Sequence, residues 1–268
     1  PRMPTISGLR RRGYTPTSLI NFAKAVGVAK RDNVIEASFL EFCAREDLNK
    51  KSRRVMVVLD PIKVVVTNYP ENKIETLLTE NNPEDKEAGH RKIHFSKVLF
   101  IERKDFRETA NRKFFRLKLG GEVRLKSAYI IKAQSVKKNG NGEIETVYCT
   151  YDPLSLSGSG TQESQRKVKG TLHWVSQKKF VKIKVNEYDR LFINPNPDSD
   201  KEQDFIKYIN PNSLISNNAF AEISLMKAEP GTSFQFQRQG YFICDKKSTE
   251  KTKVFNKTVS LRDTWTKK

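Results

Sequence analysis

Residues 1–50 carry hydrophobic positions at the spacing of an α-helix. Thr15 suits the N-cap of one helix, Pro16 its first position and Gly27 the residue that ends it. The apolar stripe of this helix comprises Leu19, Ile20, Phe22, Ala23 and Val26. A second helix is predicted over about 35–48, with an inward face formed by Ile35, Phe39, Phe42 and Cys43. We expect both stripes to form core rather than a cofactor site.

From Arg53 onward the hydrophobic pattern takes the period of a β-strand. Strands are predicted at 53–60, 62–69, 92–102, 115–119, 123–136, 146–151, 167–175, 180–186, 234–237 and 241–245. Asn139-Gly140-Asn141-Gly142 is a hairpin turn signal, and 204–218 is typical of turns with one short helix. The pattern predicts a mainly β fold with a small N-terminal α-helical subdomain and two β-barrels.

One stretch of strict alternation, residues 114–130, has an unusual polar face. Its odd positions carry Leu117, Leu119, Val123 and Leu125, and its even positions carry Arg116, Lys118, Arg124 and Lys126. A hairpin with the loop Gly120–Glu122 would pair Leu119 with Val123 and set the four cations against one another. Since like charges opposed across strands are destabilising, this face is predicted to bind an anion. The same alternation predicts that Phe115 is buried.

Composition supports a polyanionic partner. The 268 residues include fifty Lys and Arg against thirty-one Asp and Glu, a formal net charge of +19. Such a charge favours nucleic acid, because binding to phosphates releases counterions. A solvated basic surface without a partner is the alternative. There is no apolar run of eighteen residues, so we expect no membrane span.

Cysteine and histidine spacing predicts neither disulfides nor a metal site. Cys43, Cys149 and Cys244 are far apart and odd in number, which favours a reducing cytoplasm. The three histidines do not join them in any metal-ligating spacing. Nucleotide-binding glycine loops, GxSxG and HExxH are absent as well, so the residues alone favour a binding module over an enzyme.

Basic residues interleaved with aromatic residues recur at 111–126 and at 234–242. Single-stranded RNA is read by Arg and Gln side chains on base edges and by stacking on aromatic rings. Phe234, Phe236 and Phe242 are nevertheless expected in the core. For Phe114, whose even position lies among the cations, stacking and core packing remain equal alternatives.

Five strings carry a resemblance to a known family. They are PRMPTISGLRRRGYTPTSL at 1–19, DPIKVVVTNYPE at 60–71, GEVRLKSAYIIKA at 121–133, KGTLHWVS at 169–176 and VFNKTVSLRDTW at 254–265. Together, and in this order, they resemble glutaminyl-tRNA synthetases over essentially the whole chain. The first string is shared with glutamyl enzymes of archaeal and eukaryotic type, whereas the combination with the last two is more specific.

The resemblance implies the C-terminal half of a class I synthetase that grips the anticodon loop of tRNA(Gln). A helical subdomain would span 1–51, a proximal β-barrel 52–156 with 252–268, and a distal β-barrel 157–251. The parent enzyme would attach glutamine using ATP and Mg. HIGH-type and KMSKS-type motifs are absent and the sequence opens on Pro1, so we expect a fragment that is not itself an enzyme and needs no cofactor. A cytoplasmic monomer is expected. A ribosomal-protein-type RNA-binding module, a glutamyl enzyme and a non-RNA interaction domain remain alternatives.

Family anticodon readers map onto individual positions of this sequence. The resemblance assigns Arg54, Gln235 and Arg238 to the middle uracil and Arg116 to the third base, guanine. Lys113 and Phe115, beside Arg116, stand where Gln and Lys are expected, which implies altered third-base contacts. Arg124 and Lys126 match the pair near the first base, where Lys126 replaces an Arg. A point charge there favours phosphate contact over bidentate readout. Arg10, Arg11 and Arg12 match weaker contacts to the inner corner of the tRNA.

Overall fold

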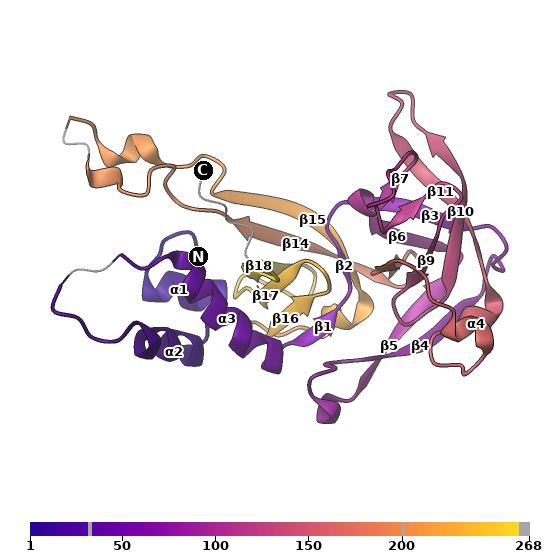
Figure 1. Cartoon of the computed structure of the whole chain (residues 1–268), viewed down its shortest axis with the longest axis horizontal. Helices are drawn as coiled ribbons and strands as arrows, with labels where there is room; N and C mark the ends of the chain where they lie inside the picture. The colour runs from indigo at the N-terminus through magenta and orange to yellow at the C-terminus, as the bar shows by residue number, and fades with distance from the viewer. Residues whose placement is uncertain (32–33, 200–201, 263–268) are drawn as a thin grey trace. The chain divides into compact units, whose positions relative to one another are not determined.

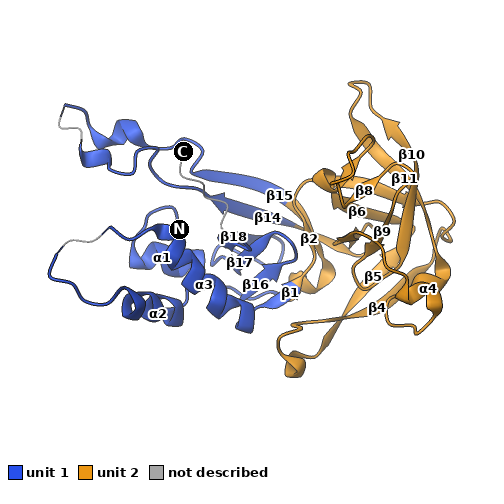
Figure 2. Ribbon diagram, in the orientation of Figure 1, with its two compact units in different colours: residues 1–54, 183–218, 228–268 blue, residues 55–182, 219–227 orange. Residues whose placement is uncertain are grey.

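The computed structural model describes residues 1–31, 34–199 and 202–262, which form two compact units (Figure 2). Counting only these described residues, unit 1 falls within 1–54, 183–218 and 228–268, and unit 2 comprises 55–182 and 219–227. The chain therefore passes from one unit to the other four times. Each unit is described by itself below.

Three helices open unit 1: α1 (Ile6–Arg12), α2 (Pro16–Val26) and α3 (Ala37–Lys51) (Figure 1). The predicted ends of α2 are confirmed. The hydroxyl of Thr15 accepts the backbone N–H of Ser18 and donates to Asp47 at 2.6 Å, which joins α2 to α3. Gly27 ends α2 with a backbone φ of 73°, a conformation that glycine adopts without steric cost.

The predicted apolar stripes of α2 and α3 are only partly buried. Cys43 is buried as expected, but Ile20 is 53% exposed and Phe42 is 49% exposed. The prediction that they face a core is therefore wrong for these two residues, and also for Ala23 and Ile35, which are exposed as well. The buried residues of these helices instead include Ser18, Ala44 and Leu48. A periodic stripe identifies one face of a helix but not the extent to which neighbouring elements cover it.

The strands of unit 1 form one sheet with the order β1-β16-β17-β18-β14-β15. Their bounds are β1 Arg53–Val55, β14 Phe180–Tyr188, β15 Leu214–Glu222, β16 Ser233–Phe236, β17 Gly240–Cys244 and β18 Lys253–Ser260. β14 and β15 each continue into unit 2. Phe234, Phe236 and Phe242 are buried in unit 1, as the sequence predicts.

The last strand, in the segment that the resemblance joins to 52–156, pairs with strands from 157–251 instead. β18 pairs antiparallel with β17 and parallel with β14, so it lies inside the sheet of unit 1. Its buried Phe255 packs edge-on against the rings of Phe234 and Phe236, which explains the pairing. Residues 263–265 of the recognised string lie outside the described residues. The division into proximal and distal barrels stays a prediction.

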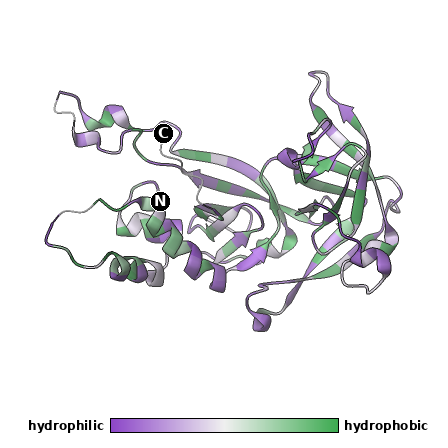
Figure 3. Cartoon of the chain, viewed as in Figure 1, coloured by the Kyte–Doolittle hydropathy of each residue, from purple (hydrophilic) through white to green (hydrophobic). Residues whose placement is uncertain are grey.

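Unit 2 is built on a sheet with the order β12-β9-β10-β11-β3-β6-β13. These strands are β3 Pro61–Val66, β6 Val98–Glu102, β9 Glu122–Leu125, β10 Ile130–Lys138, β11 Ile144–Tyr151, β12 Thr171–Leu172 and β13 Val175–Ser176. β10 and β11 are joined through Asn139–Gly142, the predicted turn, where the Gly142 N–H donates to the Asn139 carbonyl at 3.0 Å. Polar and apolar residues are mixed along these strands (Figure 3), and β9 alternates, with Val123 and Leu125 buried.

Smaller elements complete the two units. In unit 2, β4 (Ile74–Glu80) pairs with β5 (His90–Ser96), β7 (Phe106–Arg107) with β8 (Leu117–Lys118), and β2 (Val57–Val58) with the end of β15. A one-turn helix, α4, spans Gln162–Gln165. The 3₁₀-helices are η1 Lys86–Ala88, η2 Arg103–Asp105, η3 Pro153–Ser155, η4 Pro197–Ser199, η5 Phe205–Tyr208 and η6 Ile223–Lys227. The predicted fold class is confirmed: the chain is mostly β, with few helices and two barrel-like sheets.

The predicted hairpin across Gly120–Glu122 is wrong. β8 pairs in parallel with β7, while β9 pairs with β10 and β12, and no ladder joins β8 to β9 in the described part of the chain. Leu117, Val123 and Leu125 are nevertheless buried, as the alternation predicts, whereas Leu119 is 39% exposed and that part of the prediction is wrong. The apolar face is therefore satisfied by other strands, and the four cations are not opposed in one ladder.

Candidate nucleic-acid interface

A pocket of about 470 Å³ in unit 2 brings together basic and aromatic side chains. Its volume lies within the range of pockets that hold small ligands, about 300–1,000 Å³. Two segments form it, one from the region before β9 and the other leading into β12. The lining residues are Arg112, Phe114, Phe115, Arg116, Lys118, Gly121, Glu122, Lys167, Val168, Lys169 and Gly170.

Phe115 is the exposed aromatic residue of this pocket. Its side chain is 55% exposed, so the burial predicted from its odd position is wrong. The alternation breaks there because β8 begins only at Leu117, leaving Phe115 in the preceding turn. The neighbouring Phe114 is half-buried and lies 4.9 Å from the guanidinium carbon of Arg107. Phe115, rather than Phe114, therefore has an accessible ring.

Arg116 lines the same pocket with its guanidinium held on one side. Nε lies 3.3 Å from a carboxylate oxygen of Asp105, whose side chain is fully buried, and Nη1 donates to the Lys104 carbonyl at 3.1 Å. The side chain remains 42% exposed. The ion pair thus fixes the orientation of a guanidinium that still faces solvent, as a base-contacting Arg requires.

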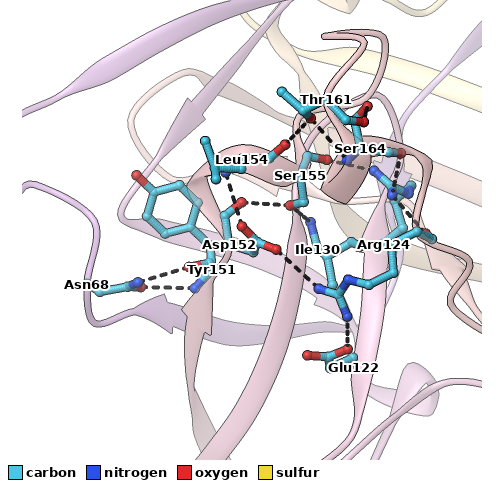
Figure 4. Close-up of polar contacts among 11 residues, drawn as sticks. Asn68, Glu122, Arg124, Ile130, Tyr151, Asp152, Leu154, Ser155, Thr161 and Ser164 are labelled. Carbon is cyan, nitrogen blue, oxygen red and sulfur yellow. Dashed lines mark hydrogen bonds and ion pairs between the residues drawn. The ribbon is translucent and has the colours of Figure 1, made fainter.

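Arg124 is directed into the protein instead of into the pocket. Nη1 donates to the Ser155 carbonyl at 2.7 Å, and Nη2 donates to the Ser164 carbonyl at 2.9 Å and to the Arg166 carbonyl at 3.2 Å (Figure 4). Burial lowers the pKa of the Arg124 guanidinium below its ordinary value. These contacts show that Arg124 fixes the segment 155–166, and its assigned role at the first anticodon base stays a prediction.

The remaining candidates of unit 2 lie apart from the pocket lining. Lys113 is exposed, and its backbone N–H donates to the Asn111 side chain at 3.1 Å. Lys126 is half-buried, and its carbonyl accepts the indole N–H of Trp174 at 3.0 Å. Of the five unit 2 residues that the resemblance singles out, Phe115 and Arg116 are brought together at the pocket.

Sequence reasoning missed two lysines of the lining, Lys167 and Lys169. They lie in the basic string RKVKG at 166–170, which directly precedes β12. The hydrophobic pattern predicts only the start of a strand here, over 167–175. The high density of positive charge at 166–170, next to the recognised string KGTLHWVS, is the signal that could identify these two lysines.

In unit 1, the candidates Arg54 of β1 and Gln235 of β16 belong to one hydrogen-bond network with side chains of α3 and β17. Nη2 of Arg54 donates to the Asn49 side chain at 2.8 Å, and the hydroxyl of Tyr241 donates to the same Asn49 oxygen at 3.2 Å. Gln235 in turn donates to the Tyr241 hydroxyl at 2.9 Å. Arg238 is exposed between β16 and β17, with a backbone φ of 66° that is uncommon outside glycine.

Two of the three arginines at the end of α1 serve the fold. Arg11 forms a bidentate ion pair with Asp245 at 2.9 and 3.0 Å, and Arg12 donates to the Lys257 carbonyl at 3.2 Å. Burial alone would raise the pKa of Asp245, but the hydrogen bond from Arg11 gives a net lowering. Arg10 is exposed, and it is the member of this group best placed for contact with RNA.

The described residues contain no group of three His, Cys, Asp or Glu side chains placed to hold a metal ion. No helix among them is long and apolar enough to cross a membrane.

Comparison with known proteins matches two segments of the chain. Residues 52–152 match the family described as tRNA synthetases class I (E and Q), anticodon binding domain, and residues 171–245 match a second family with that description. A glutamine–tRNA ligase of Vibrio vulnificus is 51% identical over 268 residues, covering 100% of this chain and 48% of the relative. The ligase of Proteus mirabilis is 50% identical over 267 residues, covering 100% and 47% respectively, and that of Alteromonas mediterranea is 52% identical over 268 residues, covering 100% and 48%. The chain thus spans about half the length of these relatives.

Proposed function

Since the chain belongs to the class I tRNA synthetases of the E and Q group, as their anticodon-binding region, we propose that it recognises the anticodon loop of tRNA(Gln). The observation that carries this proposal is the pocket of unit 2, where the exposed ring of Phe115 lies among cations. The three relatives compared above are all named glutamine–tRNA ligases, which favours tRNA(Gln) over the glutamate tRNA.

The pocket has the parts that an unstacked nucleotide requires. An aromatic ring with a free face stacks on any base, at about 1–3 kcal/mol per base. Arg116 presents donors for the acceptors of a guanine edge, in an orientation held by Asp105. The basic lining offsets the phosphate charge. Arg54, Gln235 and Arg238 in unit 1 would bind a second base.

A protein of the relatives' full length that contained this chain would attach glutamine to tRNA with ATP and Mg. This chain would supply recognition and would need no cofactor of its own. We further propose that it acts as a monomer in the cytoplasm. The proposal that this chain recognises tRNA while another part of the ligase catalyses the reaction is supported by coverage: the chain matches 48% of its relative's length.

The test is filter binding of anticodon stem-loops to the 268-residue chain at fixed salt. We expect tighter binding of the glutamine stem-loop than of variants changed at the middle or third base. Arg54→Ala and Arg238→Ala should weaken the cognate complex more than the complex with a middle-base variant. Equal losses on both RNAs would remove the base-reading role, and preference for a ribosomal RNA element would favour the general RNA-binding module.

A further inference from the structure

The pocket has a second basic wall that the assigned readers do not include, formed by the segment 166–170. We propose that Lys167 and Lys169 of this wall bind the phosphate backbone of the nucleotide whose base stacks on Phe115. This inference rests on the proposed function, and it adds a sequence-independent contact to the base-reading residues.

The first support is the charge of the lining. It holds five cations, Arg112, Arg116, Lys118, Lys167 and Lys169, and one carboxylate, Glu122. Glu122 is already paired with Arg166, and Arg116 with Asp105. Within the described residues no carboxylate forms an ion pair with Lys167 or Lys169, and both are exposed. Their charge is therefore available to an anion from outside the chain.

The second support is the position of the wall relative to the aromatic ring. The ammonium of Lys169 lies 6.0 Å from the ring centroid of Phe115. A Cβ at Gly170 would meet the Phe115 carbonyl oxygen at 2.2 Å, so the two backbones are in direct contact. The absence of a side chain at Gly170 thus brings the segment with Lys167 and Lys169 against Phe115. Lys169 lies over one face of the ring, so a base would stack on the other face, with its sugar and phosphate within reach of the lysines.

The third support is that hydrogen bonds within the protein hold the segment 166–170 in place without a ligand. The Arg124 backbone N–H donates to the Gly170 carbonyl at 2.9 Å, and its guanidinium binds the carbonyls of Ser164 and Arg166. Arg166 also reaches Asp152 at 3.2 Å (Figure 4 shows Asp152, Ser164 and Arg124 in this cluster). Side chains carried on a preorganised segment lose less entropy on binding.

Lysine suits a phosphate contact better than base readout. Its ammonium is a compact point charge without the planar fork that matches a base edge. The contact should therefore contribute equally to every stem-loop. The contacts of Phe115 and Arg116 are different, because they depend on the base in the pocket.

The experiment compares Lys167→Ala, Lys169→Ala and the double variant with Lys86→Ala, an exposed lysine of unit 2 outside the pocket. Affinities for the glutamine stem-loop and for its third-base variant are measured over a range of salt concentrations. Each pocket variant should weaken both RNAs by the same factor, and the slope of log affinity against log salt should fall by about 0.7 per lysine. Lys169→Arg should restore the slope, and Lys86→Ala should match the wild type.

Each of the other outcomes contradicts either the lysine contact or the proposed function. Unchanged slopes, with wild-type preference for the cognate loop intact, would overturn the lysine contact and leave the proposed function standing. A loss confined to the cognate RNA would assign the lysines to base readout and overturn the phosphate role. A wild-type chain without preference for the cognate loop would overturn the proposed function and this inference with it. Unaltered thermal unfolding of the variants checks that they are folded.

Discussion

At the scale of single residues, arginine and lysine have different roles in this molecule. Arg11 and Arg124 direct planar guanidinium groups onto several protein acceptors at once. Lys167 and Lys169 keep single charges in solvent beside the pocket. This division follows the chemistry, because the five donors of a guanidinium satisfy clustered carbonyls that one ammonium cannot reach together.

Phe115→Ala should weaken binding of the glutamine stem-loop while leaving the fold intact. The ring is exposed, so its loss removes little packing, whereas loss of base stacking costs about 1–3 kcal/mol, or roughly 5- to 150-fold in affinity. Filter binding and thermal unfolding measure the two effects separately. Phe115→Tyr is the matched control and should retain affinity. A variant that unfolds at lower temperature but binds normally would contradict this role.

Glu102 makes stability depend on pH in the acid range. Burial alone would raise the pKa of this carboxyl, but the contact with His173, whose Nε2 lies 3.5 Å from a Glu102 carboxylate oxygen, and the Leu59 N–H at 2.7 Å give a net lowering. Because the folded pKa lies below the unfolded value of about 4.3, the stabilisation is present above that pH and is lost as pH falls through the folded pKa.

Glu102→Gln should therefore flatten the pH dependence of the free energy of unfolding below about pH 5. It should also lower stability at neutral pH by about 1–3 kcal/mol, since the backbone donors lose a charged acceptor. Urea unfolding at a series of pH values measures both effects. An unchanged slope in acid would show that other carboxyls dominate.

At the scale of elements, one strand residue supplies several of the bonds that hold an irregular segment of unit 2. Arg124 of β9 reaches the carbonyls of Ser155, Ser164 and Arg166, so the loop from η3 through α4 is tied to the sheet at both ends. Thr161 adds a local cap by accepting the Ser164 N–H at 3.1 Å. The loop is ordered by side-chain bonds instead of a ladder.

Arg124→Ala should release this loop. Hydrogen bonds to charged groups contribute about 1.5–3 kcal/mol each, so we expect a loss of at least about 2 kcal/mol in the free energy of unfolding. Limited proteolysis should show faster cleavage within 155–166, while Arg112→Ala, an exposed arginine of the pocket, should leave cleavage unchanged. Normal protection together with lost discrimination at the first anticodon base would favour base reading by Arg124 instead.

Sequence predicted those elements whose geometry depends on adjacent residues. Thr15, Pro16 and Gly27 specify α2, and the turn at Asn139–Gly142 specifies a hairpin, because caps and turns are local structures. Strand pairing is not local. The alternation predicts the burial of Leu117 correctly but not that of Phe115, and the partner strand is β7, a segment of two residues that no pattern identifies.

The candidate site shows the same limit. Resemblance identifies Phe115 and Arg116, but it does not indicate that the string at 166–170 lies opposite them, because that approach depends on β12 pairing with β9. Similarly, residues 214–222 carry a mixed pattern with two adjacent asparagines, and only pairing makes them the strand β15. Contacts between distant parts of the sequence determine strand pairing, which neither residue propensity nor hydrophobic period predicts.

At the scale of the whole molecule, the net charge of +19 predicts binding to RNA without regard to sequence. Raising salt from about 50 to about 200 mM should weaken binding of a non-cognate stem-loop by tenfold or more, because released counterions drive that binding. Preference for the cognate loop should rise over the same range, since stacking and base contacts depend less on salt. Filter binding with both RNAs measures this ratio, and a constant ratio would contradict separate electrostatic and base-reading contributions.

The place of β18 in unit 1 sets an order of events during synthesis. All segments of unit 2 have left the ribosome once residue 227 has emerged, whereas the sheet of unit 1 lacks an internal strand until 253–260 follow. The helices at the start of the chain must therefore wait for nearly the last residues before Arg11 finds Asp245 and Thr258 finds the Arg12 carbonyl. Nascent chains stalled before residue 253 should carry a closed unit 2 beside an open, chaperone-accessible unit 1, reversing the usual precedence of the N-terminal part in folding on the ribosome.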